Sequence, residues 1–134
     1  MGIGGFIGSI IRYLVHLYFT KNVNSKIDSS SFYLTLYYNF PVATFIVNII
    51  GCFFIGFLMA YIEKTNSISE NMRLFLITGL LGSLTTFSTF SFESFDLFKN
   101  NHTNIAIIYL FLSVILGLIF CIKGYSISSV LFTK

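Results

Sequence analysis

The stretch from Thr78 to Phe92 carries the side chains best suited to binding or guiding a small ligand. It is as apolar as a membrane helix and holds no charged residue, yet glycines and hydroxyl side chains are crowded into it. Hydrocarbon offers no partner for a backbone or hydroxyl group, so polar atoms at membrane depth must bond to one another, face a neighbouring helix or line a pathway. We therefore expect the function of the chain in this stretch.

The same glycines and hydroxyls weaken the helix that the stretch would form. Gly79 and Gly82 each lower helix propensity by about 1 kcal/mol relative to alanine, and the hydroxyls that follow compete for backbone carbonyls. We therefore predict a helix that is broken around Gly82–Thr85. A broken helix at the membrane midplane exposes carbonyl oxygens, which in transporters commonly coordinate Na⁺.

Two aromatic rings follow the predicted break. Phe87 and Phe90 are three residues apart, which places them on one side of a helix. Ring edges carry the positive end of the aromatic quadrupole, so the pair could face a small anion in a dry pore. Ordinary core packing is the alternative, and for a generic phenylalanine pair it is the commoner outcome.

Uncharged polar residues also occur in two other apolar runs. Asn48 can donate two hydrogen bonds to an anion without a charge that would trap it. Tyr109 and Ser113, one helical turn apart, make a short polar stripe. Hydrogen bonding between helices is the alternative for all three residues.

Arg12 is the one charged residue well inside the first apolar run. A guanidinium there is costly and usually faces water, a partner or a pathway, unless its long side chain reaches back to the interface. The functional interpretation is attraction of an anion into a vestibule, and His16 lies one turn further on the same face.

The elements that must position these residues are membrane helices. Of the 134 residues, 55% are hydrophobic and only 10% are charged, against about 25% in soluble domains. We predict an all-α integral membrane protein in the cell membrane, with residues 1–134 forming a single four-helix domain. No basic region or cleavage site follows Met1, so the first span is expected to remain in the mature protein. The third helix is expected to be broken near its middle, and the approximate spans are 3–19, 40–62, 74–97 and 105–125.

Basic residues are divided almost evenly between the two sides of such a bundle. A fixed orientation usually shows a clear cytoplasmic excess of Lys and Arg. We therefore hypothesise that two copies associate in opposite orientations, with a single weakly signalled topology as the alternative. The scattered charges form no basic patch, so no nucleic-acid partner is expected. One side carries Lys64, Arg73, Lys123 and Lys134, and the other carries Lys21, Lys26 and Lys99.

In their order and spacing, these residues resemble the Fluc/CrcB family of fluoride channels. The resemblance covers essentially the whole chain, through GGFIGSIIRY at 4–13, TFIVNIIG at 44–51 and GLLGSLTTFSTF at 79–90. The last of these motifs is the most specific. The resemblance implies passive efflux of fluoride through two pathways in an antiparallel, dual-topology homodimer embedded in the lipid bilayer. It also implies one structural Na⁺ at the centre of the interface.

The resemblance also implies a role for individual residues. Two positions depart from the family: Gly117 stands where some members carry another hydroxyl, and Ser83 replaces a commoner glycine. By position, the resemblance implies an ion pathway of Asn48, Thr86, Phe87, Phe90, Tyr109, Ser113 and the vestibule residue Arg12, and Na⁺ ligands in the backbone carbonyls of Gly82 and Thr85.

A small multidrug-type, proton-coupled exporter is the main alternative function. Such a protein also has four spans, but it needs an ionisable carboxylate in the membrane to carry the coupling proton. Glu93 is the only candidate, and its place near the end of the third span favours an interfacial position. An enzyme is not expected, because no His, Asp or Glu pair lies at membrane depth. A structural subunit would not need the Phe-Ser-Thr-Phe track.

Overall fold

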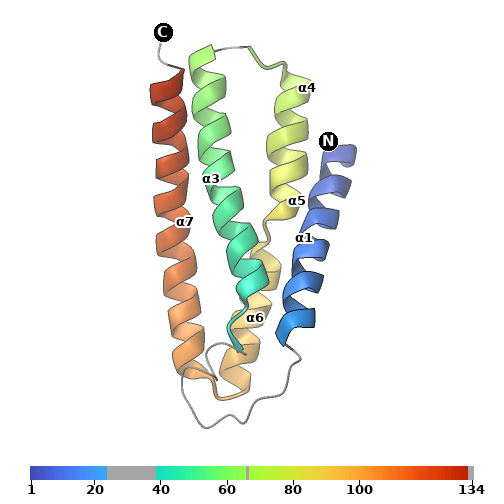
Figure 1. The fold of residues 1–134 in the computed structure, drawn as a ribbon, viewed down its shortest axis with the longest axis vertical. Helices are drawn as coiled ribbons and strands as arrows, with labels where there is room; N and C mark the ends of the chain where they lie inside the picture. Colours follow the sequence, from blue (N-terminus) through green and yellow to red (C-terminus); the bar gives the residue numbers. More distant parts are fainter. Residues whose placement is uncertain (24–38, 66, 133–134) are drawn as a thin grey trace.

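The computed structural model describes residues 1–23, 39–65 and 67–132, and the long elements in these ranges are helices that form four rods (Figure 1). Each rod is long and apolar enough to cross a membrane. The two termini lie toward one end of the bundle and the turn between α6 and α7 lies at the other. The third rod is composite, and the elements in chain order are α1 (Gly2–Val23), α3 (Val42–Thr65), α4 (Glu70–Arg73), the π-helix η1 (Leu74–Leu81), α5 (Gly82–Leu84), α6 (Phe87–Lys99) and α7 (Thr103–Leu131).

Helices α3 and α7 lie side by side over most of their length and make the most extensive contact in the bundle. A Cβ atom added to Gly56 would meet the carbonyl of Cys121, and one added to Gly124 would meet the carbonyl of Phe53. Small residues allow this close approach. In lipid, where the hydrophobic effect does not drive helices together, such close packing stabilises their association. Helices α3 and α7 therefore form the most closely packed pair of the bundle.

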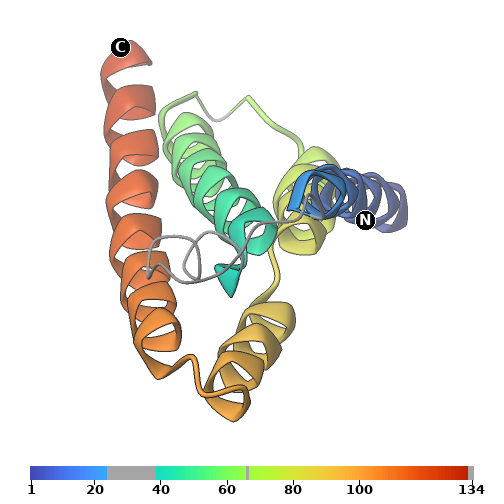
Figure 2. The same cartoon turned by 60° about the horizontal axis from the view of Figure 1, so that its bottom comes forward.

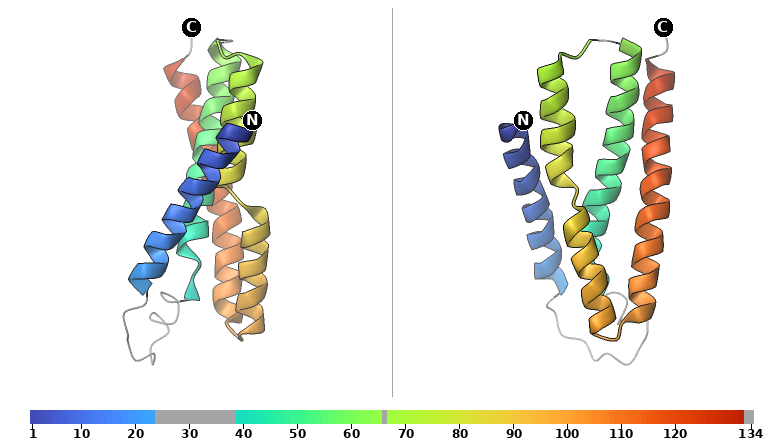
Figure 3. Two further views of the ribbon diagram at one scale, coloured as in Figure 1. Left: turned by 90° about the vertical axis from the view of Figure 1, so that its right-hand side faces the viewer. Right: turned by 180° about the vertical axis from the view of Figure 1, so that it is seen from behind.

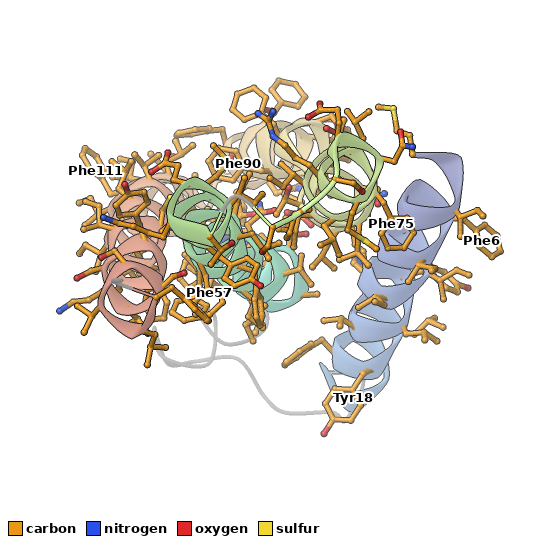
Figure 4. The ribbon with its side chains drawn as sticks, turned by 90° about the horizontal axis from the view of Figure 1, so that it is seen from above. Phe6, Tyr18, Phe57, Phe75, Phe90 and Phe111 are labelled. Atoms are coloured by element: carbon orange, nitrogen blue, oxygen red, sulfur yellow. The ribbon has the colours of Figure 1, made fainter. Side chains whose placement is uncertain are left out.

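Helix α1 crosses the third rod at an angle and packs against η1 and α5 (Figure 3). A Cβ atom on Gly8 would meet the hydroxyl of Ser83 and the carbonyl of Leu80. The opposite face of α1 is apolar and exposed, and Phe6 points away from the bundle (Figure 4). Glycine contacts thus attach α1 to the bundle along one narrow face.

Replacing Gly8 by alanine is expected to loosen α1 from the third rod. The added methyl must displace backbone or a side chain, and overpacking of this kind costs about 1–3 kcal/mol. Gly5→Ala on the same helix is the matched control, because a Cβ there meets nothing within 4 Å. The melting temperature in detergent should fall for Gly8→Ala and hold or rise for Gly5→Ala. Equal melting temperatures would contradict this account of α1.

The third rod is interrupted near its middle, as predicted, but the break begins later than the sequence suggested. Gly82 is still helical (φ −65°, ψ −28°), whereas Thr85 (φ −78°, ψ 151°) and Thr86 (φ −148°, ψ 117°) are extended. The cause is a contact from another helix: the N–H of Thr86 donates to Asn48 instead of continuing the helix. Figure 2 shows α6 displaced sideways from α5 across this extended segment.

Candidate functional site

The side-chain amide of Asn48, on α3, holds the break of the third rod in place. Its Oδ1 accepts a hydrogen bond from the N–H of Thr86 at 2.9 Å, and its Nδ2 donates to the carbonyl of Thr86 at 3.4 Å. The amide thereby pairs with both backbone groups of Thr86, in the unwound segment. Nδ2 carries a second hydrogen that this pairing does not use.

Thr86 caps the start of α6. Its Oγ1 accepts from the N–H of Thr89 at 3.3 Å and donates to Thr89 Oγ1 at 3.1 Å. Because the helix begins here, its unpaired N–H groups and the positive end of its dipole lie at the break, in the middle of the span. The site therefore attracts negative charge without holding a formal positive charge.

The break also leaves carbonyl groups without their usual helical donors, those of Gly82 and Thr85 among them. The N–H of Thr86, which would serve the carbonyl of Gly82, donates to Asn48. The N–H of Thr89, which would serve the carbonyl of Thr85, donates to a hydroxyl. Carbonyls of an unwound segment are ligands of the kind that Na⁺ takes in transporters. In the described ranges, no cluster of acidic, His and Cys side chains could hold a metal.

Gly82 is exposed, and packing within the chain does not require a glycine there. A Cβ atom would approach only the carbonyl of Ile77, at an ordinary contact distance of 3.5 Å. The departure at Ser83 is accommodated locally, because its hydroxyl donates to the carbonyl of Leu80 at 3.2 Å. The surface around Gly82 is thus open on the side that faces away from its own bundle.

The two aromatic rings beyond the break have different surroundings. The centroids of Phe87 and Phe90 are 5.9 Å apart, yet the side chain of Phe87 is 81% exposed. Phe90 packs into a core cluster, with its centroid 5.1 Å from that of Tyr109. The structure therefore brings Phe90 into the bundle beside the polar stripe and leaves Phe87 on its surface.

Glu93 is partly buried between three helices, toward the end of the third rod. Its carboxylate accepts from the hydroxyl of Thr44 at 2.7 Å and from that of Tyr109 at 2.8 Å, which joins α6 to α3 and α7. Two hydroxyl donors make a partly buried carboxylate tolerable. Helical spacing offered a signal for it, because Glu93 comes three residues after Phe90 and so shares its face.

The hydroxyl of Ser113 is buried one turn beyond Tyr109 and has no hydrogen-bond partner among the described residues. A buried donor left unpaired costs about 1–3 kcal/mol. One turn further, Gly117 lies against Cys52, whose Sγ would be 3.4 Å from an added Cβ. The stripe on α7 therefore has one hydroxyl bonded to Glu93 and one free to bind something else.

A pocket of about 250 Å³ lies between α1, α3 and α6. Arg12 and His16 line it from α1, Thr44 from α3 and Thr89 from α6. Arg12 thus borders a pocket, and its role as the vestibule residue stays a prediction.

A second pocket of about 270 Å³ lies near the turn between α6 and α7, where Glu93, Asp96 and His102 are among its lining residues. The hydrogen bond from Thr44 to Glu93 joins the two pockets, because each residue lines one of them.

Comparison with known proteins identifies the family of this chain. Residues 1–125 match the family described as CrcB-like protein, Camphor Resistance (CrcB). The chain belongs to the CrcB family. The resemblance seen in the sequence is thereby confirmed, and with its four membrane-length helices this CrcB-family chain is a multi-pass membrane protein.

Curated CrcB-family relatives carry the name fluoride-specific ion channel FluC. The protein from Flavobacterium psychrophilum is 41% identical over 118 residues, which cover 88% of this chain and 85% of the relative. That from Desulfotalea psychrophila is 42% identical over 128 residues, covering 96% and 88%. That from Clostridium perfringens is 37% identical over 132 residues, covering 98% and 93%.

Proposed function

We propose that this protein is a fluoride-selective channel, not an enzyme, and that it lets fluoride leave the cytoplasm passively and so lowers its toxicity. The observation that carries the proposal is the break of the third rod, where the Asn48 amide and the start of α6 present uncharged hydrogen-bond donors at mid-span. The names of the curated relatives give the substrate.

Uncharged donors suit a conducting site for this ion. Fluoride is small and strongly hydrated, so the pathway must replace most of its hydration shell and still release it. The unused hydrogen on Asn48, the hydroxyl of Ser113 and the ring edges of Phe87 and Phe90 offer partial positive charge only. A negative-inside potential then drives the anion outward by about 2.3 kcal/mol per 100 mV.

The functional unit in this proposal is an antiparallel pair of chains with two pathways. The exposed ring of Phe87 and the open surface at Gly82 support it, because a pathway lined by Phe87 needs a second wall. The near balance of basic residues removes a strong bias toward one orientation. A tag at the C-terminus should accordingly be labelled from both faces of the membrane, and labelling from one face alone would contradict the antiparallel pair.

A structural Na⁺ at the break, which is held and not transported, fits the same arrangement. The carbonyls of Gly82 and Thr85 would hold it, since their helical donors are engaged elsewhere. Hard cations take several oxygen ligands, and two carbonyls are too few. A second copy would supply the remainder and place the ion between the chains.

A proton-coupled exporter remains the second candidate, because Glu93 supplies the buried carboxylate that such exchange requires. Flux from liposomes separates the two functions. Purified protein should release loaded fluoride at least a hundred times faster than chloride, with protein-free liposomes as the blank. Equal fluoride and chloride fluxes, or drug transport that depends on a proton gradient, would overturn the channel proposal.

A further inference from the structure

The pocket between α1, α3 and α6 contains a titratable residue that the proposed pathway does not use. His16 lines this pocket one turn beyond Arg12, so two basic side chains border one cavity of about 250 Å³. Thr89, on the opposite wall, is hydrogen-bonded to Thr86 at the break. The pocket therefore lies next to the candidate pathway.

The charges around His16 are few and of opposite sign. Arg12 shares its helix and its pocket, and Glu93 on α6 is close enough for its charge to interact with that of His16. Thr44, which lines the same pocket from α3, bonds directly to Glu93. Helix α3 contributes only uncharged side chains to the pocket, and η1 and α5, the other elements packed against α1, contain no titratable residue.

The net charge near the pocket therefore changes when one imidazole, that of His16, gains or loses its proton. With His16 neutral, the positive charge of Arg12 is opposed by the carboxylate of Glu93, and an arriving anion meets little net attraction. Histidine is the side chain that ordinarily changes charge between pH 5 and 8. Protonation of His16 adds a second positive charge beside the cavity and offsets the repulsion from Glu93.

We propose that Arg12 and His16 form an anion-receiving site whose charge is set by protonation of His16, so that acidification speeds the arrival of the anion. The inference deepens the proposed function and rests on it. It also has a chemical logic, because fluoride crosses membranes as its uncharged acid, which forms in acidic surroundings. The channel would then conduct fluoride fastest under the acidic conditions in which most fluoride enters as its acid.

The test measures initial fluoride efflux from liposomes that have the same pH on both faces, between about pH 5.5 and 7.5. Protein-free liposomes at each pH correct for leakage of the acid. The wild-type rate should rise by roughly three- to tenfold on acidification. His16→Gln should keep the neutral rate throughout, and His16→Arg should be fast at both extremes. His102→Gln, which alters the chain's only other histidine, should respond like the wild type.

Two results would overturn the inference while leaving the channel intact: a wild-type fluoride rate that does not change with pH, or a pH response that persists in His16→Gln. A response that disappears in His102→Gln and not in His16→Gln would assign it to the other pocket and also overturn it. Absence of fluoride efflux from the wild type at every pH would remove the proposed function itself. His16 is exposed on α1, and the two substitutions at this position check one another, because a folding defect would slow both at every pH.

Discussion

Asn48→Asp is expected to reduce fluoride efflux at least a hundredfold while the protein still folds. Aspartate keeps the oxygen that accepts from the N–H of Thr86, so the break retains its shorter contact. It loses the donor of Nδ2 and places a negative charge where the anion must pass. Two like charges 4 Å apart repel by about 4 kcal/mol at an effective dielectric constant of 20, which corresponds to about a thousandfold in rate.

Asn104→Asp is the matched control for this experiment. Asn104 is exposed in the first turn of α7, where a carboxylate interacts favourably with the helix dipole. Its fluoride efflux and its melting temperature should equal those of the wild type. An Asn48→Asp protein that conducts fluoride at the wild-type rate would show that the amide lies outside the pathway.

Phe90→Ile is expected to lower fluoride efflux by about tenfold or more and to lower stability as well. Phe90 lies between two rings, with its centroid 5.9 Å from that of Phe87 and 5.1 Å from that of Tyr109. Isoleucine fills part of the space but has no ring edge to present to an anion. Each aromatic pair contributes about 0.5–1.5 kcal/mol beyond its buried area, so about 1–3 kcal/mol of stability is lost as well.

Phe111→Ile makes the same chemical change away from the site. The ring of Phe111 is 65% exposed on α7 and points away from the bundle (Figure 4). Efflux and melting temperature should both stay close to wild type in this variant. If Phe90→Ile lost stability but kept its rate of fluoride efflux, Phe90 would serve only in core packing, which is the alternative role of the aromatic pair.

The membrane helices and the interruption of the third rod could be predicted because their causes are local. Long apolar runs define the rods, and the glycines and hydroxyls of residues 79–91 weaken a helix wherever they occur. The position of the break could not be predicted as closely, because it is decided by the hydrogen bonds between Asn48 and Thr86, which join residues 38 positions apart. The π-helical geometry of η1 was not predicted, since an apolar run has the same composition whichever helix it forms.

The candidate site was predictable as a set of residues but not as a geometry. Asn48 was identified as an uncharged donor, while its bonds to Thr86 depend on how α3 meets the third rod. The hydrogen bonds of Glu93 could not be predicted, because their donors are hydroxyls from α3 and α7. The roles of Phe87, Ser113 and the carbonyl groups stay predictions that the flux experiments address.

The glycine contacts between α1 and η1 set an order of events during biosynthesis. Gly79 follows Gly4 by 75 residues, and their backbones meet, since a Cβ on Gly79 would be 3.2 Å from the Cα of Gly4. At about 5–20 residues per second, roughly 4–15 s separate the emergence of these two glycines from the ribosome. Throughout that interval α1, the least apolar of the four candidate spans, holds Arg12 without the helix on which it will pack. Helix α1 therefore lacks its packing partner until the third span has been made.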